Sequence, residues 1–82
     1  MKRELPFKCI VADEPEEVPN MFTGETIMLP ADAVAVYDVI IGMQLFAESA
    51  EGEKAEKAWQ IVRDGLEWFR QHEPRAYMVL LD

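Results

Sequence analysis

The sequence has little of what small domains use for covalent or metal-based stabilisation. Its 82 residues contain one cysteine and one histidine, Cys9 and His72, which excludes an internal disulfide and a zinc site built from several Cys and His ligands. A chain of this length buries only about 60% of the surface that its unfolded form exposes. Oligomerisation is the remaining common source of stability, so we expect more apolar surface than one copy covers.

Basic residues are missing from a long middle stretch of the chain, residues 9–53. This stretch, counted up to and including Glu53, has ten carboxylates and neither lysine nor arginine, and the formal net charge of the chain is −8. Proteins bind nucleic acid through basic side chains that displace counterions from phosphates, so we expect no direct nucleic-acid binding. An acidic surface of this kind favours basic partners.

Long apolar runs and phosphate-binding motifs are also absent. The most apolar stretch, 33–46, contains Asp38 and Gln44 and is shorter than the ~20 residues that cross a bilayer, so we expect no membrane association. The four glycines are too scattered for a phosphate-binding loop, and we expect no cofactor. The lone cysteine and the lack of a charged-then-apolar leader predict a cytoplasmic location.

The hydrophobic pattern predicts a mostly α fold with a minor β part, in a single domain over residues 1–82. One helix is expected over 30–49, with Pro30 in its first turn, where a missing N–H costs nothing. A second helix is expected over 53–72 and ends before Pro74. Because so few residues connect them, the two helices should form an antiparallel hairpin.

Short strands are expected in the N-terminal arm, residues 1–29. Phe7–Ala12 is apolar and partly β-branched, which is typical of a strand. The following segment, Asp13–Asn20, combines prolines and carboxylates and is expected to be a solvated loop. Thr23-Gly24, between Met21-Phe22 and Glu25–Leu29, suggests a tight hairpin.

The C-terminal tail, residues 75–82, fits two structures. Tyr77, Leu80 and Leu81 share a face in a helix, whereas Tyr77, Val79 and Leu81 share a face in a strand. We favour a short helix, because Pro74 suits a first helical turn.

Both long helices have two apolar faces. In the second helix, Ala55, Trp59, Val62, Leu66 and Phe69 are expected to pack on the first helix. The apolar residues left over predict an interface with a second copy, in which Trp59 is the core tryptophan and Trp68 the interface tryptophan. The alternative is that the N-terminal hairpin and the tail cover these residues within one monomer. The predicted interface consists of Ala58, Ile61, Gly65 and Trp68 with Val36, Ile40 and Met43.

Catalytic groups are sparse. Glu53, Glu56, Asp64 and Glu67 have a spacing comparable to the metal-binding carboxylates of all-helical MazG-type pyrophosphohydrolases. They are expected to project away from the helix–helix seam and to pair with neighbouring basic residues, whereas a metal site needs carboxylates that converge. We therefore expect no metal site and no enzyme. Cys9 is expected to be a small buried hydrophobe.

Three segments resemble a known group of proteins: Leu29–Asp38, Gly65–Arg70 and Ala76–Asp82. They are similar to small uncharacterised proteins of marine tailed phages, especially phages of cyanobacteria. The resemblance covers roughly residues 29–82 and rests on packing motifs without catalytic content. It implies a viral product in the host cytoplasm and implies no activity.

Together these features predict a small acidic, non-enzymatic protein–protein interaction module. We expect a homodimer that acts as a regulator or adaptor by binding a basic or apolar surface of a host protein. One alternative is an acidic nucleic-acid mimic that inhibits a DNA- or RNA-binding protein. The least favoured alternative is a MazG-like metal-dependent hydrolase.

Overall fold

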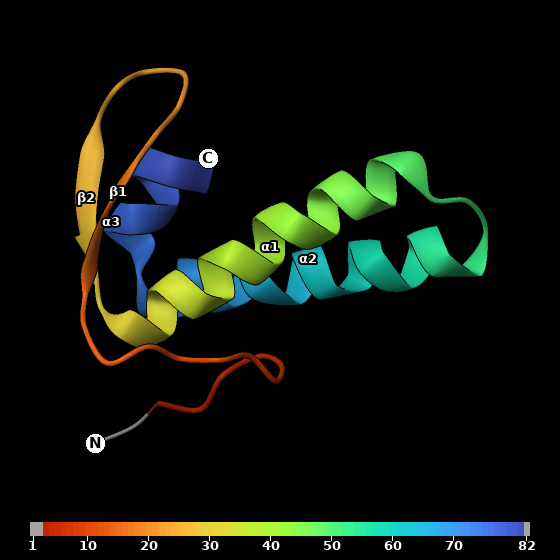
Figure 1. Ribbon diagram of the computed structural model, residues 1–82, viewed down its shortest axis with the longest axis horizontal. Helices are drawn as coiled ribbons and strands as arrows, with labels where there is room; N and C mark the ends of the chain where they lie inside the picture. Colours follow the sequence, from red (N-terminus) through yellow and green to blue (C-terminus); the bar gives the residue numbers. More distant parts are fainter. Residues whose placement is uncertain (1–2, 82) are drawn as a thin grey trace.

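The chain folds into a helical hairpin with a small β-hairpin and a short C-terminal helix at one end (Figure 1). The computed structural model describes residues 3–81 and confirms the predicted mostly helical fold class. Residues 1, 2 and 82 of the predicted domain lie outside the described range. The elements in chain order are β1 (Glu16–Pro19), β2 (Thr26–Leu29), α1 (Ala31–Ser49), α2 (Glu53–His72), α3 (Pro74–Ala76) and the π-helical turn η1 (Tyr77–Leu81).

The two long helices match the predicted positions within a residue. Pro30 lies at the N-cap of α1 with extended backbone, not inside the first turn as predicted, and its carbonyl accepts the N–H of Val34. Gly52 opens α2 with φ of +64°, a conformation that favours glycine. This short connection reverses the chain, so α1 and α2 run antiparallel (Figure 1).

The core lies where α1, α2 and β2 meet. Its largest fully buried side chains are Leu29, Val36, Ile40 and Phe69. Gly65 brings the α2 backbone against Ile40, since a Cβ at this glycine would lie 2.5 Å from the Cγ1 atom of Ile40. Small residues at a helix contact permit such a close approach.

The strand predicted over Phe7–Ala12 is wrong, because this segment has no strand partner and packs on the helices as an extended coil. Its side chains divide between two environments: Phe7 and Cys9 pack on the core, whereas Ile10 is 95% exposed. Burial on helices satisfies the same alternating pattern that a strand would show.

The first strand instead forms inside the predicted acidic loop. In β1, Val18 points inward and is buried, while Glu16, Glu17 and Pro19 stay exposed, so pairing with β2 costs no charge burial. The pairing is antiparallel, with Val18 opposite Ile27. The segment Asp13–Asn20 therefore contributes to the core, contrary to the prediction.

The β1–β2 turn presents two apolar side chains. The Oδ1 atom of Asn20 accepts hydrogen bonds from the backbone N–H groups of Phe22 and Thr23, and Gly24 takes φ of +79°. The hairpin is thus present, but Met21 and Phe22 belong to its turn and not to a strand. The Nδ2 group of Asn20 also donates to the carbonyl of Val79 at 2.7 Å, which ties the turn to η1.

The tail is helical, as favoured from the sequence. Pro74 begins α3, and the chain continues through η1, where Leu80 and Leu81 pack on the core. The last residue of the predicted tail, Asp82, lies outside the described residues. Proline at the first helical position explains why the helix and not the strand forms.

Candidate functional site

The predicted interface residues are mostly buried within the chain itself. Ile61 and Met43 are half-buried, and the other five are inaccessible to a partner in this structure. At these five positions the chain covers its own apolar surface, so a partner could reach them only if the covering parts of the chain moved away. The buried residues are Val36, Ile40, Ala58, Gly65 and Trp68.

The N-terminal segment, residues 3–13, helps to cover this face, whereas the monomer alternative expected the hairpin and the tail to do so. The indole Nε1–H of Trp68 donates to the carbonyl of Glu4 at 2.9 Å. Leu5 and Phe7 pack on the core, and Phe7 lies against Gly65. Trp68 is only 5% exposed and is therefore the core tryptophan.

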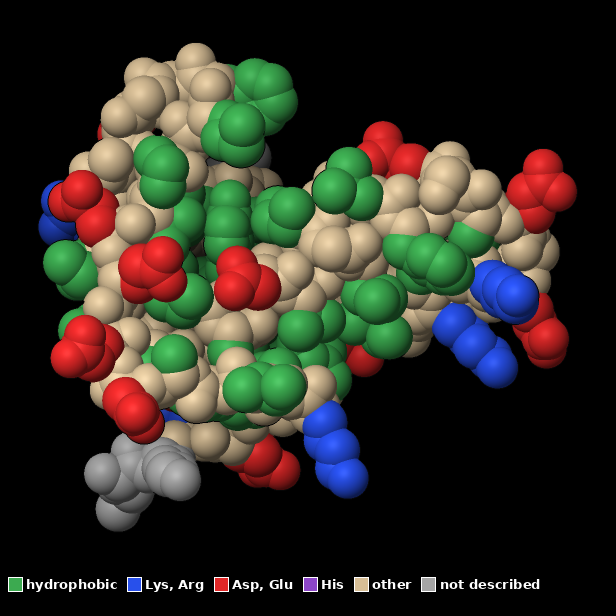
Figure 2. Space-filling model, in the orientation of Figure 1, with side chains coloured by type: hydrophobic (Ala, Val, Ile, Leu, Met, Phe, Trp, Pro, Cys, Tyr) green, Lys and Arg blue, Asp and Glu red, His purple; other side chains and the backbone are tan. Residues whose placement is uncertain are grey.

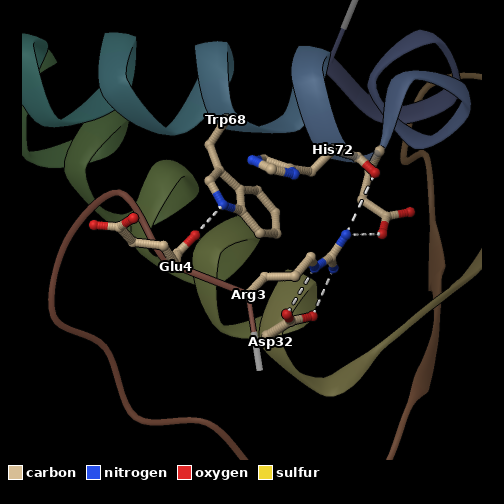
Figure 3. A network of polar contacts seen from close by, with 6 residues as sticks. Arg3, Glu4, Asp32, Trp68 and His72 are labelled. Carbon is tan, nitrogen blue, oxygen red and sulfur yellow. Dashed lines mark hydrogen bonds and ion pairs between the residues drawn. The ribbon is translucent and has the colours of Figure 1, made fainter. Parts of the chain in front are cut away.

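A group that we name the Arg3 clasp (Arg3, Asp32, Trp68 and Glu73) fastens the start of this segment (Figure 3). The guanidinium donates to both Asp32 carboxylate oxygens at 2.9 and 2.7 Å and to Glu73 at 2.7 Å. It also lies 4.8 Å from the Trp68 ring centroid. The hydrogen bonds from Arg3 hold the pKa of Asp32 below its ordinary value. No periodic signal marks Arg3, so sequence reasoning missed this group.

On another side of the helical hairpin the structure leaves an apolar groove open. Figure 2 shows it as a hollow with hydrophobic side chains, between the β-hairpin and the long helices. Its volume is about 670 Å³. Its apolar walls come from the β1–β2 turn (Met21, Phe22), α1 (Tyr37, Ile41), α2 (Trp59, Leu66) and η1 (Leu80, Leu81).

Helical spacing positions the walls of the apolar groove. Tyr37 and Ile41 lie one turn apart on α1, and Trp59 and Leu66 lie two turns apart on α2. In the row that the sequence assigned to the first helix, only Val62 and Phe69 are fully buried, while Trp59 remains half-buried. Trp59 is thus the tryptophan beside open surface, the reverse of the prediction.

The turn adds the most exposed part of the groove. Met21 is 91% exposed and Phe22 is 99% exposed, which are large values for apolar side chains. Their position in a turn fixed by Asn20 explains why they do not fold onto the core. Contiguous exposed apolar surface of this kind marks interaction sites.

The charges near the groove are unevenly placed. On α1, Asp38 directly follows the groove residue Tyr37, and burial together with the Asp38 charge raises the pKa of Tyr37. Glu48 lies one turn beyond the groove residue Gln44 and shares its face. On the α2 side, Arg63 lines the groove and donates to the Oε1 atom of Gln60 at 3.0 Å.

The carboxylates compared with MazG-type enzymes do not converge. Glu53, Glu56, Asp64 and Glu67 are all exposed. Glu67 pairs with Arg70, and Asp64 accepts a hydrogen bond from Gln60. Within residues 3–81, no three His, Cys, Asp or Glu side chains gather where they could hold a metal ion.

The two other candidate catalytic groups have structural surroundings. Burial, with a smaller contribution from the charge of Asp32, raises the pKa of the Cys9 thiol, which disfavours the reactive thiolate. Cys9 is half-buried and packs on the core, close to the buried position predicted for it. The His72 ring lies against Trp68, with 5.2 Å between ring centroids.

The apolar groove is thus the candidate site that the geometry offers. None of the helices in the described part of the chain has the length and hydropathy needed to span a membrane. No protein-family model, curated protein or solved structure matches this chain. The function must therefore be argued from the groove itself.

Proposed function

We propose that this protein is a non-enzymatic protein–protein interaction module and that the apolar groove is its docking site. The observation that carries the proposal is the groove with its exposed wall, Met21 and Phe22. A partner that covers Phe22, Trp59 and Leu66 would remove apolar surface from water, at roughly 25 cal/mol per Å². Aromatic side chains around such a centre are typical of binding hot spots.

The groove replaces the dimer interface predicted from the sequence as the basis for partner binding. That interface depended on Trp68 and Gly65, which the chain covers itself. A second copy remains a candidate partner, and under this proposal it would bind in the groove. Self-association that depends on Phe22 would therefore support the interaction module and identify another copy as the partner.

The carboxylates support an adaptor more than a nucleic-acid mimic. A mimic needs free carboxylates arranged like phosphates on one face. Asp32, one of the ten in the stretch 9–53, is bound by Arg3 and is only partly exposed. The proposed adaptor needs only charges around an apolar patch.

The test uses two matched surface variants. Phe22→Glu changes a groove residue and Ile10→Glu changes an exposed residue outside the groove; because both side chains are at least 95% exposed, neither substitution removes core packing. Wild-type protein would be used to select peptides from a displayed random library, and each peptide would then be titrated against the three proteins. We expect peptides that bind wild type and Ile10→Glu equally but bind Phe22→Glu about tenfold more weakly.

Two results would refute the proposal. In the first, the library yields no peptide that binds above background and wild type stays monomeric over a concentration series. In the second, peptides are recovered but bind all three proteins with equal affinity. Either result would show that the groove is not a docking site.

A further inference from the structure

The shape and the charges of the apolar groove point to one kind of occupant. We infer that the groove binds an amphipathic helix of a partner protein, with lysine or arginine along the edge of its apolar face that lies next to α1. This inference rests on the proposed function and adds the conformation and the charge of the partner.

A helix fits because the groove runs between two long helices. Tyr37 and Ile41 on α1 lie about one turn apart, four residues or about 6 Å along the axis. Trp59 and Leu66 repeat on α2 over two turns. A helix laid along this pair would place side chains at i, i+3, i+4 and i+7 into the same spacing, as in helix-in-groove recognition.

The acidic α1 side predicts the charge of the occupant. Two carboxylates on α1 lie next to groove-lining residues without lining the groove themselves: Asp38 follows Tyr37, and Glu48 lies one turn beyond Gln44. The helix α1 carries no lysine or arginine. The β-hairpin, which forms the next wall, is equally free of basic residues. In Figure 2 several acidic side chains lie near the hollow, and the basic side chains that are visible on this face lie farther from it.

The α2 side of the groove disfavours basic residues of the partner, so the preference for lysine or arginine applies to the α1 side alone. Arg63 is the basic residue among the groove-lining residues. A lysine of the partner beside Arg63 would be repelled, whereas one beside Asp38 or Glu48 would be attracted. The basic residues should therefore lie along the α1 edge only, which also fixes the orientation of the helix about its axis.

Charge argues against a second copy as the occupant. If α1 of another copy entered the groove, its Asp38 and Glu48 would face Asp38 and Glu48 of the first copy. Neither of the two α1 helices has a basic residue to pair with these carboxylates. Each copy also carries a formal net charge of −8. A basic helix from another protein meets neither form of repulsion.

The experiment compares three synthetic peptides of about 16 residues, roughly four helical turns. All three carry leucine at i, i+3, i+4 and i+7 and differ only along one edge of that face, which is lysine, glutamine or glutamate. Affinities for the full chain would be measured by calorimetry at low and high salt. We expect the lysine peptide to bind about tenfold more tightly than the glutamine peptide at low salt, and the glutamate peptide to bind most weakly.

Two charge-reversal variants test where the charge acts. Asp38→Lys reverses a charge on α1 next to the groove residue Tyr37, whereas Glu14→Lys makes the same change in net charge at an exposed residue far from it in the sequence and outside the groove. The lysine peptide should lose about tenfold in affinity for Asp38→Lys and less than about twofold for Glu14→Lys. Equal losses would show that only overall charge matters, which would refute the inference.

The outcomes separate this inference from the proposed function. If lysine and glutamine peptides bind equally and Phe22→Glu abolishes both, the groove docks helices but the charge preference is wrong. If no helical peptide binds while other selected peptides depend on Phe22, the module stands and the helical occupant is wrong. Self-association that depends on Phe22 and strengthens with salt would identify a second copy and overturn the inference.

Discussion

Two flanks of the same helical hairpin differ in how far the rest of the chain covers them. On one flank, Ala58, Gly65 and Trp68 are buried, and the N-terminal segment lies over Gly65 and Trp68. On the other, Trp59 and Leu66 line an open groove. Both flanks show the same apolar periodicity in the sequence. The difference teaches that an irregular covering segment, and not the helical pattern, decides which apolar row stays open to solvent.

The covered flank is fastened by specific polar contacts at its start. The Trp68 indole bonds to the backbone of Glu4, and the Arg3 guanidinium lies over the same ring. Trp68 also packs edge-on against Phe69, with 5.3 Å between ring centroids. Among residues 3–81 no such segment covers the groove flank, so Trp59 should contribute less to stability and more to the proposed binding.

Replacing each tryptophan by alanine should give the largest contrast. Trp68→Ala removes a buried ring and its hydrogen bond and should lower the free energy of unfolding by about 3–5 kcal/mol. Trp59→Ala removes a half-buried ring and should cost about 1–2 kcal/mol. Urea unfolding followed by circular dichroism would measure both.

The loss of peptide affinity should follow the opposite order, with the larger loss for the Trp59 variant. Peptides that dock in the groove should lose affinity for Trp59→Ala, while a folded Trp68 variant such as Trp68→Phe should bind like wild type. Equal stability costs for the two alanine variants would mean that the two flanks are equally covered, which contradicts the comparison.

Much of the helical hairpin could be predicted from the sequence. Pro30, Gly52 and Pro74 mark where α1, α2 and α3 begin, and the 3.6-residue period supplies the rest. These are local signals, because the N–H and φ requirements of a helix end act within a few residues. The same reasoning could not tell Trp59 from Trp68.

The predictions that failed concern features that depend on contacts between distant parts of the chain. Arg3 reaches Asp32 and Glu73, which are 29 and 70 residues away, and neither spacing leaves a periodic trace. Phe7 fits a strand or a covering coil equally well by its hydrophobicity. Val18 forms a strand among carboxylates because only one side chain in four must be buried. The groove was missed because its walls come from four separate elements.

Alanine substitutions at Gly65 and Gly42 should distinguish the tight contact between the two helices from open helix surface. A Cβ at Gly65 would lie 2.5 Å and 2.8 Å from Ile40 side-chain atoms and 3.4 Å from Phe7. Gly65→Ala should therefore destabilise the fold by about 1–2 kcal/mol, since overpacking outweighs the helix-propensity gain. Thermal or urea unfolding would detect this change.

Gly42 is the matched control on α1. A Cβ there meets no atom within 4 Å, so Gly42→Ala should stabilise the fold by about 0.5–1 kcal/mol. If both alanine variants were more stable than wild type, Ile40 would have moved aside at little cost, and the close contact at Gly65 would not be a constraint.

The Arg3 clasp should give the smallest effect and one that depends on pH. Arg3→Met keeps an apolar stem but removes the ion pairs to Asp32 and Glu73, and should cost about 1 kcal/mol at neutral pH. The pKa of Asp32 is lower in the folded protein than in the unfolded chain. Its contribution is therefore fully present above its unfolded pKa of about 3.9 and is lost as the pH falls through the lower folded value.

The stability difference between wild type and Arg3→Met should consequently narrow as the pH falls below about 4. Lys8→Met is the control, because Lys8 is an exposed cation on the same segment and its loss should change stability by less than about 0.5 kcal/mol at any pH. Urea titrations of the three proteins across the acid range would measure both effects. A difference that stays constant down to pH values where Asp32 is protonated would show that Arg3 fastens the covering segment through the Trp68 ring and not through the carboxylate.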